Sequence, residues 1–289
     1  MSDLPPALRV LDGCPFWQMD GAGNDFVIVD LRRGGELTRE AAQYLGDREG
    51  PFGCDQIIGL VLDETGGTTM IIYNTDGSFA GACGNASRCV GWLLMEETGE
   101  SELTFGSPSG PLYATRAGDA QITVDMGEPK LGWEDIPLAE EMNDTRYIDI
   151  KLGPIDKPVL WGPSAISMGN PHCVFFVADV DTQALDRFGP MIEHHPLYPE
   201  GANVSVAQAV DRETLRVRTW ERGVGLTQAC GTAACASLVS AVRRRLTDRK
   251  ATVHMPGGAL IIEWDEATNH VFKTGPIRLS RQGVFGAVA

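Results

Sequence analysis

The sequence has no long uninterrupted apolar run. None of its apolar stretches approaches the ~18 residues that a helix needs to span a bilayer. The first ten residues, MSDLPPALRV, lack the basic region and the hydrophobic stretch of a secretory signal. We therefore expect a soluble, cytoplasmic protein with no membrane partner. The 289 residues, 43% hydrophobic and 22% charged, have an ordinary globular composition and the length of about two domains.

Positive charge is scarce. The chain has 24 lysine and arginine residues against 39 aspartate and glutamate residues, which gives a formal net charge of −15. An acidic surface repels the phosphate backbone of nucleic acids, so a nucleic-acid partner is not expected. The charge favours solubility and says little about a small substrate.

The closely spaced cysteine pairs of metal and redox motifs are also missing. The seven cysteines are odd in number and irregularly spaced, and no C-x-x-C occurs. A zinc ribbon and a thioredoxin motif are therefore unsupported, and we expect no bound metal. In a cytoplasmic chain most cysteines are small buried hydrophobic residues, which is the simplest interpretation of any one of them.

What the sequence does contain is a repeat. The stretches ACGNASRCV at 82–90 and ACGTAACAS at 229–237 place two cysteines 147 positions apart. Further polar residues fall in the same register, because an offset of 147 or 146 separates Asn74 from Glu221, Gln56 from Asn203, and Asn24 from Asn170. Chance could supply one or two of these pairs, but the whole set predicts two diverged copies of one fold.

Elements of the same kind follow in the same order in each half. Alternating or continuous β-type runs precede a Gly-rich turn, a cysteine and an apolar helix. We expect strands at 26–30 and 68–74 and a helix at 85–99 in the first half, and strands at 173–177 and 214–221 and a helix at 232–246 in the second. The helices are apolar in their first turns, as buried helices are, and Gly99 is a suitable C-cap.

These patterns predict a mixed α+β fold of two pseudo-symmetric domains, each a mixed β-sheet or barrel around a central helix. Residues 126–141 are rich in proline, glycine and acidic residues and resemble a connection between halves. We expect an N-terminal domain at 1–128, joined by C-terminal strands at about 275–289, and a C-terminal domain at 129–274. The active site is expected in the cleft between the domains.

Cys83 and Cys230 stand where the two helices are expected to begin. The first turn of a helix presents unpaired N–H groups and the positive end of its dipole, so a thiolate is favoured there. We expect the pKa of such a cysteine to fall below the ~8.5 of a free thiol. Gly84 and Gly231 follow directly and leave each sulfur unshielded by a side chain.

Two opposed thiols suit a racemase or epimerase. Such an enzyme removes a proton from one face of a carbon and returns one to the other face, so a thiolate can act as base and a thiol as acid. The same pattern also fits a pair of buried structural cysteines, or a redox disulfide that closes two domains. The spacing alone leaves these interpretations open.

Six motifs together resemble the diaminopimelate epimerase family: MDGAGNDFVIVD, YNTDG with ACGNASRC, SMGNPHCVFFV, GANVS, WERGVG and ACGTAACAS. The resemblance runs from Met19 to Thr274–Pro276. It implies two similar α/β halves, each a helix wrapped by a mixed sheet, and a homodimer. It also implies interconversion of LL- and meso-2,6-diaminopimelate, in lysine and cell-wall synthesis, without pyridoxal phosphate or metal.

The resemblance also implies roles for individual residues. Cys83 and Cys230 match the acid/base pair, and Gly84, Asn85, Gly231 and Thr232 match the helix-start positions that hold the α-carboxylate of the substrate. His172 matches a family position that tunes the cysteines or orients Glu221, or is simply a core histidine. The remaining substrate-contacting positions are matched by Asn24, Gln56, Asn74, Asn170, Asn203, Glu221 and Arg222.

The chain departs from the family pattern at three places. Ala86 and Ala233 stand where glycine is common, and both keep the backbone N–H that an anion site needs. Leu226 stands where glutamate is common, which removes any polar contact from that position. Two alternatives remain beside the epimerase: an enzyme like proline racemase, whose substrate has one carboxylate, and a non-enzymatic redox or binding protein that does not need Arg222 or Gln56.

Overall fold

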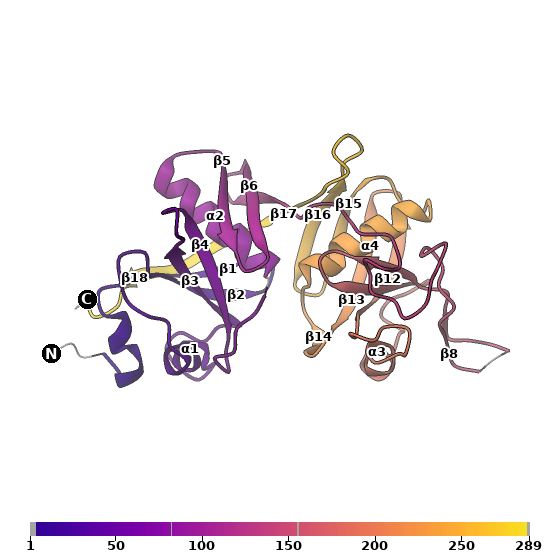
Figure 1. The fold of residues 1–289 in the computed structure, drawn as a ribbon, viewed down its shortest axis with the longest axis horizontal. Coiled ribbons are helices and arrows are strands. Elements are labelled where there is room, and N and C mark those ends of the chain that lie inside the picture. The colour runs from indigo at the N-terminus through magenta and orange to yellow at the C-terminus, as the bar shows by residue number, and fades with distance from the viewer. Residues whose placement is uncertain (1–3, 82, 155, 288–289) are drawn as a thin grey trace. The chain divides into compact units, whose positions relative to one another are not determined.

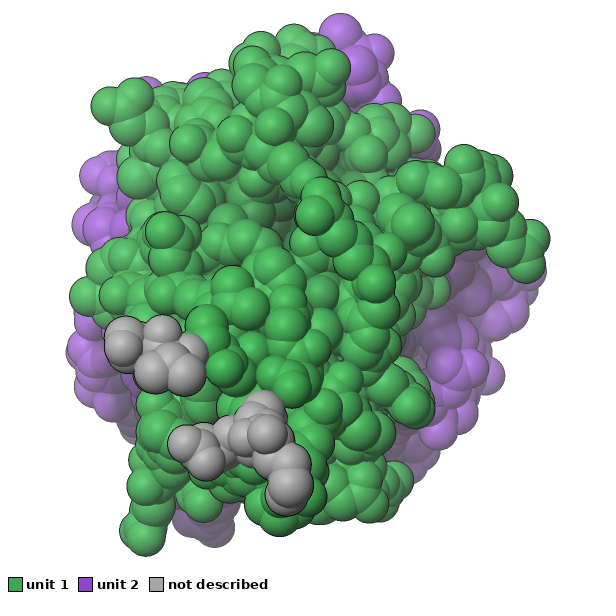
Figure 2. All heavy atoms as spheres, turned by 90° about the vertical axis from the view of Figure 1, so that its left-hand side faces the viewer, with its two compact units in different colours: residues 1–124, 275–289 green, residues 125–274 purple. Residues whose placement is uncertain are grey.

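The computed structural model describes residues 4–81, 83–154 and 156–287, and these form two compact units. Unit 1 comprises Met1–Val124 and Gly275–Ala289, and unit 2 comprises Asp125–Thr274 (Figure 2). The C-terminal segment thus belongs to the same unit as the N-terminal one. None of the helices in the described ranges is long and apolar enough to cross a membrane.

Unit 1 is built on a mixed sheet whose strands follow the order β7-β6-β5-β4-β3-β2-β1-β18. Strand β2 runs parallel to β3, and β3 runs antiparallel to β4. Strand β18 pairs with β1, so the last strand of the chain completes the first half. The strands are β1 (Pro15–Asp20), β2 (Asp25–Asp30), β3 (Gln56–Leu62), β4 (Thr68–Asn74), β5 (Glu102–Ser107), β6 (Gly110–Gly118), β7 (Gln121–Asp125) and β18 (Arg278–Val284).

The helices of unit 1 lie against this sheet. Helix α2 (Gly84–Thr98) packs on β5 and β6, while α1 (Arg39–Gly46) packs on β3, β4 and the 3-10 helix η1 (Pro6–Leu11). Ten residues between Asn85 and Met95 of α2 are buried, so this helix is surrounded by protein rather than lying on the surface (Figure 1). The core between α1, η1 and the sheet is formed by aliphatic and aromatic side chains that include Leu8, Leu45 and Ile57.

Unit 2 repeats this plan. Its strands follow the order β10-β11-β12-β13-β15-β16-β17, with β14 beside β13 and a separate two-stranded hairpin of β8 and β9. The strands are β8 (Lys151–Leu152), β9 (Leu160–Trp161), β10 (Ser164–Ser167), β11 (Pro171–Phe176), β12 (Asn203–Asp211), β13 (Thr214–Glu221), β14 (Gly225–Thr227), β15 (Lys250–Met255), β16 (Gly258–Trp264) and β17 (Val271–Pro276). Helix α4 (Gly231–Arg243) packs against β10 to β13, β15 and β16, and α3 (Leu185–Glu193) packs on β12, β13 and β14 (Figure 1).

The register of the strands repeats with the sequence. In unit 1, Phe26 of β2 lies opposite Gln56 of the parallel strand β3, and in unit 2, His172 of β11 lies opposite Asn203 of the parallel strand β12. Each sheet then turns back antiparallel, and a helix follows. The prediction of a mixed α+β fold with two repeated halves is confirmed by these pairings.

Both helices begin at the predicted cysteines. Cys83 is the N-cap of α2 and Cys230 is the N-cap of α4, and both have extended backbone angles. Helix α2 ends at Gly99, whose φ of 77° lies in the left-handed region that favours glycine. The sequence therefore predicted the position of both helix starts and the end of the first helix correctly.

Candidate functional site

Cys83 lies at the beginning of α2 in unit 1. Its Sγ accepts a hydrogen bond from the backbone N–H of Ala86 at 3.5 Å, so a first-turn amide is directed at the sulfur. The sulfur also lies 4.0 Å from Oδ1 of Asn24, which the repeat had paired with Asn170. Two residues predicted for the site, 59 positions apart, are thus in contact.

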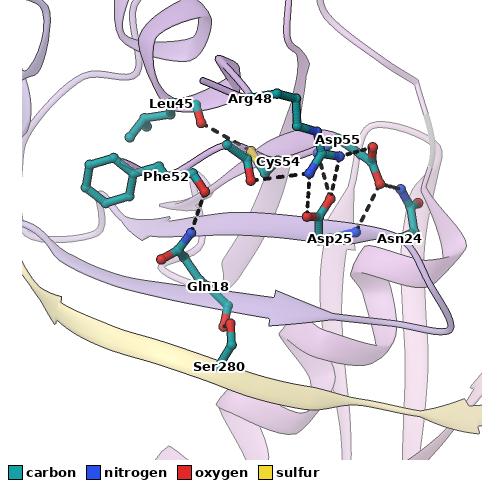
Figure 3. Close-up of polar contacts among 10 residues, drawn as sticks. Gln18, Asn24, Asp25, Leu45, Arg48, Phe52, Cys54, Asp55 and Ser280 are labelled. Atoms are coloured by element: carbon teal, nitrogen blue, oxygen red, sulfur yellow. Dashed lines mark hydrogen bonds and ion pairs between the residues drawn. The ribbon is translucent and has the colours of Figure 1, made fainter. Parts of the chain in front are cut away.

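Asn24 is held by a network of charged residues from the start of β2 and from the loop between α1 and β3 (Figure 3). Its Nδ2 donates to Oδ2 of Asp55 at 2.6 Å, and Arg48 bridges Asp55 and Asp25. Burial alone would raise the pKa of Asp25, but its hydrogen bonds to Arg48 and Asp55 outweigh burial and lower it. The lowered pKa keeps Asp25 ionised, and the hydrogen bond from Asn24 to Asp55 holds the Asn24 side chain beside Cys83.

Gln56 and Asn74 form a second pair in unit 1. They lie opposite each other on the antiparallel strands β3 and β4, and Nε2 of Gln56 donates to Oδ1 of Asn74 at 3.1 Å. Nδ2 of Asn74 in turn donates to Oγ of Ser78 at 3.0 Å. The pairing fixes both amides at the strand ends next to the turn that leads to Cys83.

The first residues of α2 are held from inside the unit. Asn85 is 3% exposed, and its Oδ1 accepts a hydrogen bond of 3.1 Å from Nη1 of the fully buried Arg88. The Asn85 side chain is therefore committed to the interior, and its contribution to an anion site comes from its backbone N–H. Gly84, which precedes it, carries no side chain that could cover that group.

Cys230 occupies the equivalent place in unit 2. It is 5% exposed, and its Sγ lies 3.5 Å from Oγ1 of Thr232. Burial raises the pKa of the Cys230 thiol far above its ordinary value, and the neighbouring Glu221 carboxylate raises it further. The expectation that a helix start lowers the pKa is wrong for Cys230, because desolvation and a like charge outweigh the amides of the first turn.

Asn203 and Arg222 are joined at the ends of β12 and β13. Asn203 is buried, donates to the carbonyl of Pro171 at 3.0 Å and accepts from the backbone N–H of Arg222 at 3.0 Å. The Arg222 guanidinium donates to the carbonyl of Glu200 at 2.8 Å, and its stem passes over Gly201, where a Cβ would lie 3.1 Å from Cδ of Arg222. Arg222 is exposed, so the rest of its guanidinium is available to a ligand.

His172 is a buried partner of Asn170. Its Nε2 lies 2.9 Å from Oδ1 of Asn170, and the ring is fully buried. Burial, assisted by the positive charge of Arg222, lowers the pKa of His172 to about 3. The ring is therefore neutral at physiological pH, and the contact it makes is with Asn170 rather than with Glu221.

Glu193 is a site-forming residue that the sequence analysis missed. It lies at the end of α3 and is 6% exposed, and its carboxylate accepts from Nε1 of Trp220 at 2.6 Å and from the backbone N–H of Gly223 at 2.8 Å. Trp220 and Gly223 stand directly before and after Glu221 and Arg222 in the chain. The sequence repeat gives no signal for Glu193, because α3 lies outside the repeated motifs and the two contacts span 27 and 30 positions.

We expect Glu193→Gln to loosen the turn that carries Glu221 and Arg222. The amide that replaces one oxygen cannot accept, so one buried donor loses its partner, at a cost of roughly 1–3 kcal/mol of unfolding free energy. Urea denaturation and kcat/KM should both report the change. Glu263→Gln, which breaks an exposed pair with Lys250, is the matched control and should cost less than about 1 kcal/mol. Equal stability of the two variants would contradict the role of Glu193.

The departures from the family pattern leave the helix starts intact. Ala86 and Ala233 are buried in the first turns, and the N–H of Ala86 makes the hydrogen bond to Cys83 described above. Leu226 of β14 is 45% exposed and lies opposite Trp220 of β13. In unit 1 the corresponding pair is Phe79 opposite Tyr73, so an exposed apolar residue stands at this turn in both halves.

Across the described parts of the chain, no group of three or more His, Cys, Asp and Glu side chains is arranged to hold a metal ion. Each unit presents a cysteine at the N-cap of a buried helix. In unit 1 the sulfur lies beside the Asn24 amide, and in unit 2 it lies beside Thr232 and is acted on by the Glu221 carboxylate.

Comparison with known families shows to which family this chain belongs. The profile of the diaminopimelate epimerase family matches residues 16–132 and 164–280, once in each half of the chain. This chain belongs to the diaminopimelate epimerase family. It is 50% identical over 275 residues to a diaminopimelate epimerase of Brucella anthropi, covering 93% of this chain and 91% of that protein. It is 48% identical over 283 residues to one of Afipia carboxidovorans, covering 96% and 97%.

Solved structures of more distant proteins share the fold of this family. A probable proline racemase from Agrobacterium radiobacter superposes with a TM-score of 0.63 at 15% identity, covering 96% of this chain and 93% of the other. A phenazine biosynthesis protein from Enterococcus faecalis gives a TM-score of 0.63 at 17% identity, covering 93% and 98%. At these identities the likeness concerns the fold, and it agrees with the predicted pair of repeated α+β domains.

Proposed function

We propose that this protein converts LL-2,6-diaminopimelate to meso-2,6-diaminopimelate by proton transfer between two cysteines. The observation that carries the proposal is the repeated helix start: each unit places one cysteine, Cys83 or Cys230, at the N-cap of a buried helix. Membership of the epimerase family supplies the substrate. The reaction needs two acid/base groups that work on opposite faces of one α-carbon, and the two copies of the fold supply one each.

In the proposed reaction a thiolate removes the α-proton and a thiol returns one to the other face. The buried Cys230 beside Glu221 has a raised pKa, so it is a thiol before substrate binds and is ready to act as an acid. Loss of the proton from the α-carbon leaves carbanion character that must be stabilised. The backbone N–H groups of Gly84, Asn85, Gly231 and Thr232 are suited to hold the α-carboxylate and its growing negative charge.

We propose that the carboxamides and Arg222 recognise the rest of the substrate. Arg222 is exposed and can form a bidentate pair with the distal carboxylate. Glu221 can accept from an ammonium group, and Asn24, Gln56, Asn74, Asn170 and Asn203 offer amides for the polar ends of the substrate. In this proposal His172 acts as the neutral residue that holds Asn170 in place.

The decisive experiment follows exchange of the α-proton. We expect the purified protein in deuterated water to incorporate deuterium at the α-carbon of LL-diaminopimelate while the meso isomer appears, with no added cofactor. L-Proline is the matched control and should show no exchange. Activity that depends on added pyridoxal phosphate or is abolished by a chelator, or faster exchange with proline, would contradict the proposal.

Two further expectations rest on the family resemblance. We propose that the protein is a homodimer and that it works in the cytoplasm, where its pathway operates.

A further inference from the structure

Lys273 is a fully buried lysine on β17. A lysine is rarely buried completely, because removing an ammonium group from water is costly unless a negative group lies close to it. On the sheet it lies opposite Ile262 of β16, a strand on which α4 packs. The function assigned so far to Cys230 and its neighbours makes no use of this charge.

The Lys273 ammonium lies at the start of α4. Its Nζ is 2.6 Å from the position that a Cβ on Gly231 would occupy, and its Cδ and Cε are 3.4 and 3.5 Å from the same position. Gly231 directly follows Cys230 and is the first residue of α4. Position 231 therefore favours glycine for two reasons. A glycine leaves the Cys230 sulfur uncovered, and any larger side chain would displace the Lys273 ammonium.

A cation is ordinarily unfavourable at this end of a helix. The first turn carries the positive end of the helix dipole, which repels a nearby ammonium group. A lysine in this place becomes favourable when negative charge is present or develops there. Glu221, which acts on the Cys230 thiol, is one such group, and the Cys230 thiolate that forms during proton transfer is another.

Unit 1 has a buried cation at the same place, but from a different part of the chain. Arg88 of α2 is fully buried, and its Nη1 lies 3.4 Å from the carbonyl of Gly84 and 3.1 Å from Oδ1 of Asn85. By the 147-position repeat, the residue equivalent to Arg88 in α4 is Cys235, which is buried and carries no positive charge. At that position α4 carries no arginine, and the buried cation beside its first residue is Lys273 of β17.

We propose that Lys273 is a positioning residue that supplies the Cys230 helix start with the positive charge that Arg88 supplies to the Cys83 helix start. The charge offsets Glu221 and favours the Cys230 thiolate when that cysteine is the base, a role that rests on the proposed function. Cys235 lies one turn along α4 itself. Among the strands that pack on α4, β11 carries His172 and β13 ends at Glu221.

The test replaces Lys273 by methionine and measures the reactivity of Cys230. Methionine is uncharged and of similar length, so it can fill the same buried space. The probe is iodoacetamide in the absence of substrate, with the alkylation of each cysteine followed by peptide mass mapping between pH 7 and 10. Only the thiolate reacts, so the rate at a fixed pH reports the thiolate fraction.

We expect Lys273→Met to slow alkylation of Cys230 about tenfold or more at a given pH, because loss of a close positive charge raises a thiol pKa by about one unit or more. Cys83 in the same molecule is the internal control and should react at its normal rate. Lys250→Met removes an exposed lysine of β15 that pairs with Glu263, and it should change neither rate. Unchanged alkylation of Cys230, or equal slowing of both cysteines, would overturn the proposal.

The catalytic readout separates this inference from the proposed function. If the protein is an epimerase, the acid limb of kcat/KM in Lys273→Met should move to higher pH for the direction in which Cys230 is the base. If the wild-type protein has no epimerase activity but Lys273→Met slows alkylation of Cys230 alone, the role of the Lys273 charge stands and the proposed function fails. If it is an epimerase whose pH profile and Cys230 reactivity are both unchanged in Lys273→Met, the charge assignment fails alone.

Discussion

Cys83→Ser should lower kcat for epimerisation of diaminopimelate by about 100- to 10,000-fold, the range that a positioned acid or base contributes. The serine hydroxyl fits the space of the thiol and the helix N-cap but hardly ionises near neutral pH, so one face of the α-carbon loses its proton acceptor. The measurement is the initial rate of conversion of LL to meso isomer. Cys230→Ser should show a loss of similar size if both cysteines take part.

The single variants should also separate the two faces of the reaction. With one cysteine left, exchange or elimination at one face can persist while inversion is lost. Solvent deuterium exchange, measured beside isomer conversion, would reveal this difference. Cys89→Ala is the matched control: this cysteine lies in the same helix, fully buried, and burial raises its pKa to about 12. Full epimerase activity in Cys83→Ser, or an equal loss in Cys89→Ala, would exclude the two-cysteine mechanism.

Arg222→Lys should reduce kcat/KM for diaminopimelate by about 10- to 100-fold. Lysine keeps the positive charge but loses the planar fork that can bind a carboxylate through two parallel hydrogen bonds. Loss of a charged hydrogen bond of this kind costs roughly 1.5–3 kcal/mol of transition-state stabilisation. The hydrogen bond from Arg222 to the carbonyl of Glu200 shows that one side of the guanidinium is already used for positioning.

The control for Arg222 is Arg216→Lys on the same strand. Arg216 is a half-buried arginine that pairs with Asp181, so it offers the same change in chemistry away from the proposed site. We expect Arg216→Lys to have nearly unchanged kinetics. Near wild-type kcat/KM in Arg222→Lys would remove Arg222 from substrate binding, whatever the result for the cysteines.

Several features of the fold were predictable because they depend on short stretches of sequence. The apolar helix that follows a cysteine and ends at Gly99 is a local pattern, and so are the strands at Thr68–Asn74 and Thr214–Glu221, whose predicted bounds agree with the structure. The repeat added the relation between halves, since a constant offset between polar residues survives only where both copies keep the same register. These features reflect backbone preferences and burial patterns, which neighbouring residues largely decide.

The contacts that hold the candidate residues were not predictable, because they join distant positions. Arg48 reaches Asp25 and Asp55 from a loop after α1, and Glu193 reaches Trp220 from α3. Nothing in the spacing of these residues distinguishes them from ordinary surface charges. Their roles in positioning follow from which side chains the folded sheet brings together.

The sequence by itself determined the family, the repeated α+β plan and the placement of Cys83 and Cys230 at two helix starts. Tertiary structure decided the electrostatics of those starts. The helix dipole predicts a lowered pKa at any N-cap, but Cys230 is buried beside Glu221, and desolvation and like charge raise its pKa instead. It is also the fold that brings Lys273 against Gly231, although the two residues are 42 positions apart in the chain. A dipole belongs to a local element, whereas burial and charge pairing depend on every segment packed around it, so only the folded chain defines them.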